Sequence, residues 1–139
     1  MSLWIQITPG SNEPLYSQVV RQVSEAIAKG RLCPGDKLPS VRKLASELII
    51  NPNTVARAYS QLEQNGLVTS RTGAGTFVTD PSLRDKDAAQ LSILADRMDN
   101  LISQSLNLGL SEGKAIEMFK NRFGKFTHDK RKDGAKENE

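Results

Sequence analysis

The sequence of 139 residues predicts a mostly α-helical fold with a small β-hairpin, namely a winged helix-turn-helix followed by a short two-helix segment. Three observations predict this fold. Apolar residues recur at helical spacing in three segments between residues 12 and 66. Two short β-type segments then flank a Thr-Gly-Ala turn. Beyond an Asp-Pro-Ser boundary at residues 80–82, a heptad-like apolar pattern begins.

The first helix is expected at residues 15–29. Its apolar residues recur every four positions and would form one stripe of an amphipathic helix, namely Leu15, Val19, Val23 and Ile27. Pro14 suits the start of a helix and Gly30 suits its end. Before this helix, apolar residues alternate with others at positions 3–7, so we expect a short strand there.

The second and third helices are expected to be short and tightly joined. The second begins near Ser40, and its residues expected to face the core are Val41, Leu44, Ala45 and Leu48. The dipeptide Asn51-Pro52 separates the helices, because proline disfavours α geometry in the preceding residue and suits the first position of a new helix. Asn51 can cap that new helix. The third helix turns inward Val55, Ala58, Tyr59 and Leu62.

Three polar side chains are expected to emerge together near the start of the third helix. Asn53, Thr54 and Arg57 share the side opposite the apolar set. An α-helix fits the major groove of B-DNA, where Asn matches adenine, Arg matches guanine and a Thr methyl can meet a thymine methyl. Taken alone, this pattern suits an ordinary solvated helix face equally well. The preceding helix and the following hairpin favour the interpretation as a DNA-reading helix.

Two neighbouring elements are expected to contact the DNA backbone. Ser40, Arg42 and Lys43 lie at the start of the second helix, where hydroxyl, guanidinium and helix N–H groups suit phosphate oxygens. Residues 67–71 and 75–78 form the hairpin, or wing. Its expected DNA contacts are Arg71, Thr72, Gly73, Gly75 and Thr76. The simpler interpretations are a cationic surface helix and a plain hairpin turn.

The domains are expected as a winged helix-turn-helix at residues 10–80, a two-helix dimerisation segment at 83–126 and a charged, disordered tail at 127–139. Little within the chain would cover the apolar residues of the two-helix segment, and isolated helices this short need packing. We therefore expect a homodimer, formed through Leu91, Leu94, Met98, Leu101, Leu108, Phe119 and Phe123. The alternative is that both helices fold back on residues 12–80 in one monomer.

The composition limits the other classes of function. A net charge of +3 and a pI of about 9.1 permit a nucleic-acid partner without requiring one. The single cysteine, Cys33, excludes an internal disulfide, so a cytoplasmic location is expected. No secretory signal or membrane-spanning stretch is seen. The only histidine, His128, lies in the tail, so no metal site and no cofactor is expected. No catalytic set or phosphate-binding loop indicates an enzyme.

The motifs resemble the GntR family of bacterial transcription regulators, and the form of the third helix is similar to its YtrA subfamily. The resemblance covers residues 10–80 and lies in P-L-Y-S-Q-V (14–19), G-D-K-L-P-S-V-R-K-L-A (35–45), N-P-N-T-V-A-R-A-Y-S-Q-L-E-Q-N-G-L-V (51–68) and R-T-G-A-G-T-F-V (71–78). It implies a dimeric repressor, often linked to ABC transport operons. It also implies DNA contacts at Arg42, Asn53, Thr54, Arg57 and Gly73. The family usually has Gly between the second and third helices, whereas Leu48-Ile49-Ile50 stands here.

Together these observations predict a sequence-specific regulator that binds double-stranded DNA as a homodimer. The alternative is a winged helix that contacts RNA or protein, because the fold alone does not decide function. The sequence shows no surface aromatic platform of the kind that stacks single-stranded bases. The two-helix segment is too short to enclose an effector pocket within one subunit. A small-molecule site between subunits therefore stays open, as do the operator and the target genes.

Overall fold

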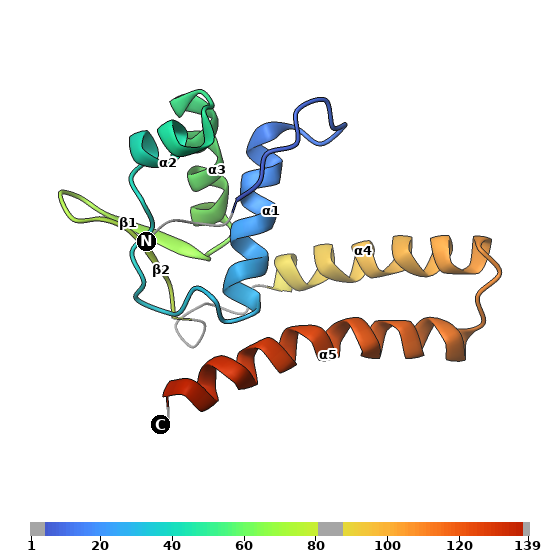
Figure 1. Cartoon of the computed structure of the whole chain (residues 1–139). Coiled ribbons are helices and arrows are strands. Elements are labelled where there is room, and N and C mark those ends of the chain that lie inside the picture. Colours follow the sequence, from blue (N-terminus) through green and yellow to red (C-terminus); the bar gives the residue numbers. More distant parts are fainter. Residues whose placement is uncertain (1–4, 81–87, 138–139) are drawn as a thin grey trace. The chain divides into compact units, whose positions relative to one another are not determined.

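The computed structural model describes residues 5–80 and 88–137, with side chains described as far as residue 127 (Figure 1). The chain divides into two compact units, Met1–Arg84 and Asp85–Glu139. The expected start of the dimerisation segment at residue 83, and most of the boundary at residues 80–82, lie outside the described residues.

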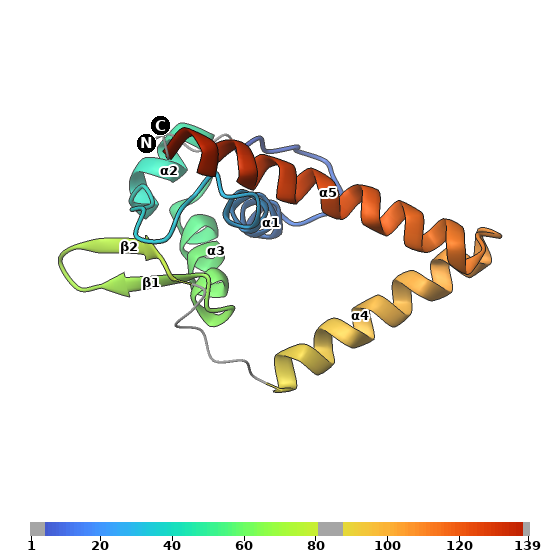
Figure 2. The same cartoon turned by 90° about the horizontal axis from the view of Figure 1, so that it is seen from below.

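The described part of the first unit contains three helices and an antiparallel two-stranded hairpin. In order these are α1 (Leu15–Ala28), α2 (Val41–Leu48), α3 (Pro52–Gln64), β1 (Val68–Arg71) and β2 (Gly75–Val78). The central element is α3, because it contacts α1, α2 and β1. The turn of the hairpin projects on the side of α3 away from α1 (Figures 1 and 2). This arrangement is the winged helix-turn-helix that the sequence predicts.

The core of the first unit forms where the apolar faces of the three helices meet. Its residues include Val19 and Val23 of α1, Leu44 and Ala45 of α2, and Val55, Ala58, Tyr59 and Leu62 of α3. These are positions that the helical spacing predicts to face inward. Val68 and Val78 add the base of the hairpin to the same core and are paired across the strands.

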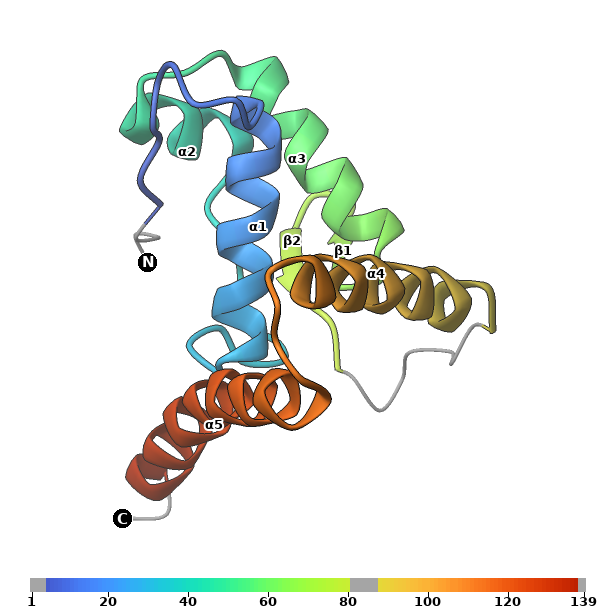
Figure 3. The ribbon, with the colours of Figure 1, turned by 90° about the vertical axis from the view of Figure 1, so that its right-hand side faces the viewer.

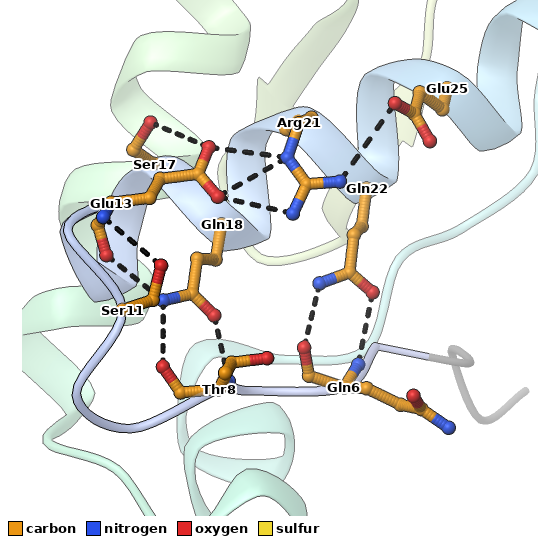
Figure 4. A network of polar contacts seen from close by, with 9 residues as sticks. All are labelled: Gln6, Thr8, Ser11, Glu13, Ser17, Gln18, Arg21, Gln22 and Glu25. Carbon is orange, nitrogen blue, oxygen red and sulfur yellow. Dashed lines mark hydrogen bonds and ion pairs between the residues drawn. The ribbon is translucent and has the colours of Figure 1, made fainter.

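Side-chain amides, rather than a strand, hold the segment before α1 (Figure 4). Gln22 accepts a hydrogen bond from the Gln6 N–H at 2.9 Å and donates one to the Gln6 carbonyl at 2.8 Å. The buried Gln18 makes the same two contacts with Thr8, at 2.8 and 3.2 Å. One helical turn separates the two glutamines, so their amides meet alternate backbone residues as a neighbouring strand would. The strand expected at residues 3–7 is accordingly wrong over residues 5–7, and residues 3 and 4 lie outside the description.

The turn between α2 and α3 places a β-branched residue in left-handed geometry. Ile49 has φ 56° and ψ 51°, and it is the one non-glycine residue with positive φ in the described part of the chain. The Ile50 N–H donates to the Ala45 carbonyl at 3.0 Å, which closes the C-terminus of α2. The chain therefore reverses at Ile49 without the glycine that such geometry favours.

The second unit consists, over its described residues, of α4 (Ala88–Asn107) and α5 (Glu112–Glu137), joined by a short turn (Figure 3). Gly109, with φ 83°, ends α4, and the Leu110 N–H donates to the Ser105 carbonyl at 3.0 Å. Ser111 caps α5, because its Oγ accepts from the Lys114 N–H at 3.2 Å.

The structure differs from the sequence prediction at the end of this second helix. We expected disorder at residues 127–139, whereas α5 continues to Glu137, and residues 138 and 139 lie outside the described residues. The prediction rested on the absence of large apolar residues. Seven of the thirteen tail residues are nevertheless Lys, Glu, Arg or Ala, which have high helix propensity, and extending an existing helix requires no new nucleation.

Candidate nucleic-acid interface

The start of α3 presents polar groups on the side away from the core. Asn51 caps the helix, its Oδ1 accepting from the Asn53 N–H at 2.8 Å, and Pro52 occupies the first turn. Asn53 and Arg57 are exposed, whereas Thr54 is half-buried. The expected outward side is thus observed for all three, with Thr54 nearest the edge of the core. An amide, a hydroxyl and a guanidinium thus lie within about the first two turns of α3.

An aromatic ring from α1 lies against the guanidinium of α3. The Cζ atom of Arg57 is 3.8 Å from the centroid of the Tyr16 ring, a cation–π contact. Tyr16 belongs to the first turn of α1 and is half-buried, packed against the core. This contact could not be predicted from the sequence, because no local pattern indicates that two residues so far apart in the chain lie together.

A buried tyrosine fixes α3 to the entry of α2. The Tyr59 hydroxyl donates to the Pro39 carbonyl at 2.6 Å. Burial, together with the nearby Glu47, raises the pKa of Tyr59 far above its usual value, so the phenol stays protonated and remains a donor. Directly after Pro39, the Ser40 Oγ accepts from the Lys43 N–H at 3.1 Å and caps α2. Arg42 and Lys43 are exposed on this first turn, as expected.

The wing is a four-residue ladder that pairs Arg71 with Gly75 next to its turn. The Ala74 N–H donates to the Arg71 carbonyl at 3.0 Å, and Gly73 has φ 78°. Arg71, Thr72 and Gly73 are exposed, whereas Gly75 and Thr76 are half-buried. The Arg71 guanidinium lies 4.9 Å from the centroid of the Phe77 ring, so it covers one face of the wing.

Lys37 is a cation beside the wing that is not among the DNA contacts expected from the sequence. It forms a β-bridge with Phe77, and the Leu38 N–H donates to the Thr76 carbonyl at 2.8 Å. A Cβ atom added at Gly75 would lie 2.7 Å from the Lys37 Cε, so the lysine side chain runs closely over this glycine. The sequence around Lys37 gives no indication of the path of this side chain, which only the structure shows.

The cations of the first unit separate into paired and unpaired groups. On α1, Arg21 contacts Glu13 at 3.1 Å and Glu25 at 3.9 Å (Figure 4). The Arg21 guanidinium holds the pKa of Glu13 below its usual value. In contrast, no carboxylate within the described residues forms a salt bridge with the exposed cations around α2, α3 and the wing, which are Lys37, Arg42, Lys43, Arg57 and Arg71. The positive charge available to an anionic partner is therefore concentrated there.

The second unit presents large apolar side chains in addition to charged ones. The residues expected at a dimer interface are between 42% and 81% exposed, namely Leu91, Leu94, Met98, Leu101, Leu108, Phe119 and Phe123. The rings of Phe119 and Phe123 pair with their centroids 5.9 Å apart. Large exposed apolar patches of this kind are typical of interaction surfaces.

Comparison with known proteins decides the family. Residues 15–78 match the model of the bacterial regulatory proteins of the gntR family. The HTH-type transcriptional repressor YtrA of Bacillus subtilis is 37% identical over 116 residues, which cover 84% of this chain and 89% of that protein. The chain belongs to the GntR family of bacterial regulatory proteins. Within that family the comparisons support the YtrA subfamily.

Solved structures with a similar fold agree with this assignment. A transcriptional antiterminator from Listeria monocytogenes aligns with a TM-score of 0.77 and 28% identity, over 86% of this chain and 88% of that chain. YtrA from Sulfolobus acidocaldarius aligns at 0.56 with 37% identity, over 70% and 97%. The DNA-binding domain of AraR, solved with its operator ORX1, aligns at 0.50 with 29% identity, over 57% and 99%.

This GntR member is accordingly a DNA-binding transcription regulator, and its relatives are regulators rather than enzymes. None of its described helices combines the length and apolarity needed to cross a membrane.

Proposed function

We propose that this protein is a homodimeric repressor that reads a two-fold operator in the cytoplasm through α3, supported by α2 and the wing. One observation carries the proposal. Within the first unit, the outward side of α3 and the elements beside it carry five exposed cations that form no salt bridge among the described residues. Asn53 and Arg57 would contact bases, Arg42 and Lys43 would contact phosphates, and the wing would approach the adjacent backbone.

The described aromatic residues of the first unit favour double-stranded DNA over a single-stranded partner. Stacking of unpaired bases requires an open aromatic face. Tyr59 is buried. The guanidinium groups of Arg57 and Arg71 lie over the rings of Tyr16 and Phe77. These three rings are therefore already covered, and the exposed groups around them are hydrogen-bond donors and cations.

The apolar faces of α4 and α5 support the homodimer. Fully burying a Leu, Met or Phe side chain is worth about 1.5–3 kcal/mol relative to leaving it exposed. Seven such side chains retain between 42% and 81% of their exposure, so a second copy that covers them would gain several times that amount. Two copies related by a two-fold axis would also place two recognition helices on successive half-sites.

Repression and the nature of the target rest on the relatives. The Bacillus subtilis relative is named a transcriptional repressor, and we propose the same sign of regulation here. The resemblance to the YtrA subfamily points to a transporter operon as the target. We propose no effector site within the first unit, because its cavity is too small for a drug-sized ligand. The cavity lined by Ile5, Gln22, Val23 and Leu32 holds about 100 Å³, whereas drug-sized pockets are about 300–1,000 Å³.

Selection of bound fragments from a random duplex library tests the proposal directly. We expect one enriched sequence with two-fold symmetry, a binding constant that falls steeply with salt and a protein mass of two chains in sedimentation equilibrium. A competing single strand of the same sequence should not displace the duplex. Enrichment of no sequence, or preference for the single strand, would contradict the proposal. Fused upstream of a reporter, the selected operator should lower expression when the protein is present.

A further inference from the structure

The contact between Arg57 and Tyr16 joins two helices at the expected base-reading surface. The Arg57 Cζ lies 3.8 Å from the ring centroid, within the range of close stacking. Arg57 is exposed on α3, and Tyr16 is a half-buried residue of α1. Because α1 and α3 pack against each other and Tyr16 also packs against the core, the ring is a fixed support. The mobile partner in the contact is the arginine.

Stacking restricts the guanidinium without occupying its hydrogen-bond donors. The guanidinium is planar, and its five N–H groups lie in that plane and point outward from its edges. A ring against one face leaves those edges available. A carboxylate partner would instead consume donors and cancel the charge, and none forms a salt bridge with Arg57 among the described residues. Tyr16 can therefore hold Arg57 in place while both donors needed for the O6 and N7 atoms of guanine remain free.

We propose that Tyr16 is a positioning residue that orients the Arg57 guanidinium toward a base edge before DNA arrives. This inference rests on the proposed base-reading role of α3. Fixing a flexible side chain in its bound orientation reduces the ordering cost of binding, and a misplaced guanidinium loses its bidentate geometry. The aromatic face provides this effect, and the Tyr16 hydroxyl is not required for it.

Substitutions at Tyr16 separate positioning from a direct contact. Y16F keeps the ring and should retain the wild-type affinity and base preference. Y16L removes the aromatic face but keeps an apolar side chain against the core. It should lower affinity for the selected operator about three- to tenfold, and it should relax the preference at the single base pair whose preference R57A also relaxes. Thermal unfolding of each variant identifies any general loss of structure.

A double-mutant cycle measures whether Tyr16 acts through Arg57. In the R57A background, Y16L should have almost no further effect on binding, because the side chain it orients is absent. The matched control is R42A, which removes a proposed phosphate contact on a different helix. In the R42A background, Y16L should have its full effect. If Y16L fails to fold, Y16M serves as the ring-free variant in the same cycle.

The outcomes distinguish this inference from the proposed function. Additive losses for Y16L and R57A, or a Y16L loss spread evenly over all operator positions, would overturn the positioning role while leaving DNA reading intact. A uniform loss in Y16F would assign the action to the hydroxyl and also overturn it. A wild-type protein that selects no duplex sequence would remove the proposed function and this inference together.

Discussion

Replacing Ile49 with glycine should stabilise the first unit, which reverses the usual effect of removing an apolar side chain. Ile49 has φ 56° and ψ 51°, and its side chain is 90% exposed. Left-handed geometry costs an L-residue about 1–2 kcal/mol, and a β-branched side chain is among the least suited to it. Because so little of the side chain is buried, its removal sacrifices little apolar burial.

The greater backbone freedom of glycine in the unfolded state reduces this gain in the free energy of unfolding. Glycine loses more backbone freedom on folding than other residues, which costs about 0.5–1 kcal/mol. The net expectation for Ile49→Gly is therefore a stabilisation of about 0.5–1 kcal/mol. For a unit of this size, about 1 kcal/mol corresponds to a rise in Tm of about 4–8 °C.

Urea unfolding followed by circular dichroism measures this prediction, with two matched controls. Ile49→Ala keeps a Cβ and hence most of the strain, so it should gain less than the glycine variant. Ile50→Gly changes the adjacent half-buried residue, which packs against the core and has no positive φ, and it should destabilise the unit. A glycine variant at residue 49 that is less stable than the wild type, or no more stable than the alanine variant, would refute the reasoning.

Four further predictions concern the interface, the wing, the second unit and the N-terminal segment. Arg57→Ala should cost about 1–3 kcal/mol and relax one operator position, whereas Arg42→Ala should weaken binding to all duplexes alike; titrations against single-substitution operators check both, and an even loss for Arg57→Ala would contradict its base-reading role. Gly75→Ala should destabilise the first unit by about 1–3 kcal/mol in urea unfolding, because φ is 122° and the added Cβ would meet a lysine side chain, so an unchanged midpoint would show that the wing adapts freely. Leu101→Asp should shift sedimentation from two chains to one at equal concentration without changing the first unit's unfolding, and a persistent dimer would place the interface elsewhere. Gln18→Leu should cost about 1–3 kcal/mol, because it leaves the Thr8 amide and two carbonyls without their hydrogen-bond partner, and full stability would imply that water replaces the amide.

The sequence predicted those parts of the fold in which nearby residues determine the outcome. The cap at Asn51, the start of α2 near Ser40 and the hairpin around Gly73 all depend on residues within one turn of one another. The inward face of α3 follows from the spacing of its own apolar residues. In each of these places the local preference and the tertiary packing agree.

The parts that the sequence did not predict depend on contacts between distant segments or on competition between weak effects. The expected N-terminal strand failed because the backbone groups of Gln6 pair with the Gln22 amide of α1, which no alternation pattern reveals. The stack of Arg57 on Tyr16 has the same origin. The continuation of α5 to Glu137 reflects helix propensity in a charged segment, where composition alone favoured disorder.

The hydrogen bond from Tyr59 to the Pro39 carbonyl ties the recognition helix to the residue that precedes Ser40. In the proposed DNA complex, the phosphate contacts of α2 and the base contacts of α3 would consequently move together as one rigid body. A regulatory signal that acts on this protein would therefore hardly change the arrangement of α2 and α3 within one DNA-binding unit. In the proposed homodimer, such a signal would instead act on the separation and angle between the two DNA-binding units, so that induction would change the half-site spacing that the dimer fits.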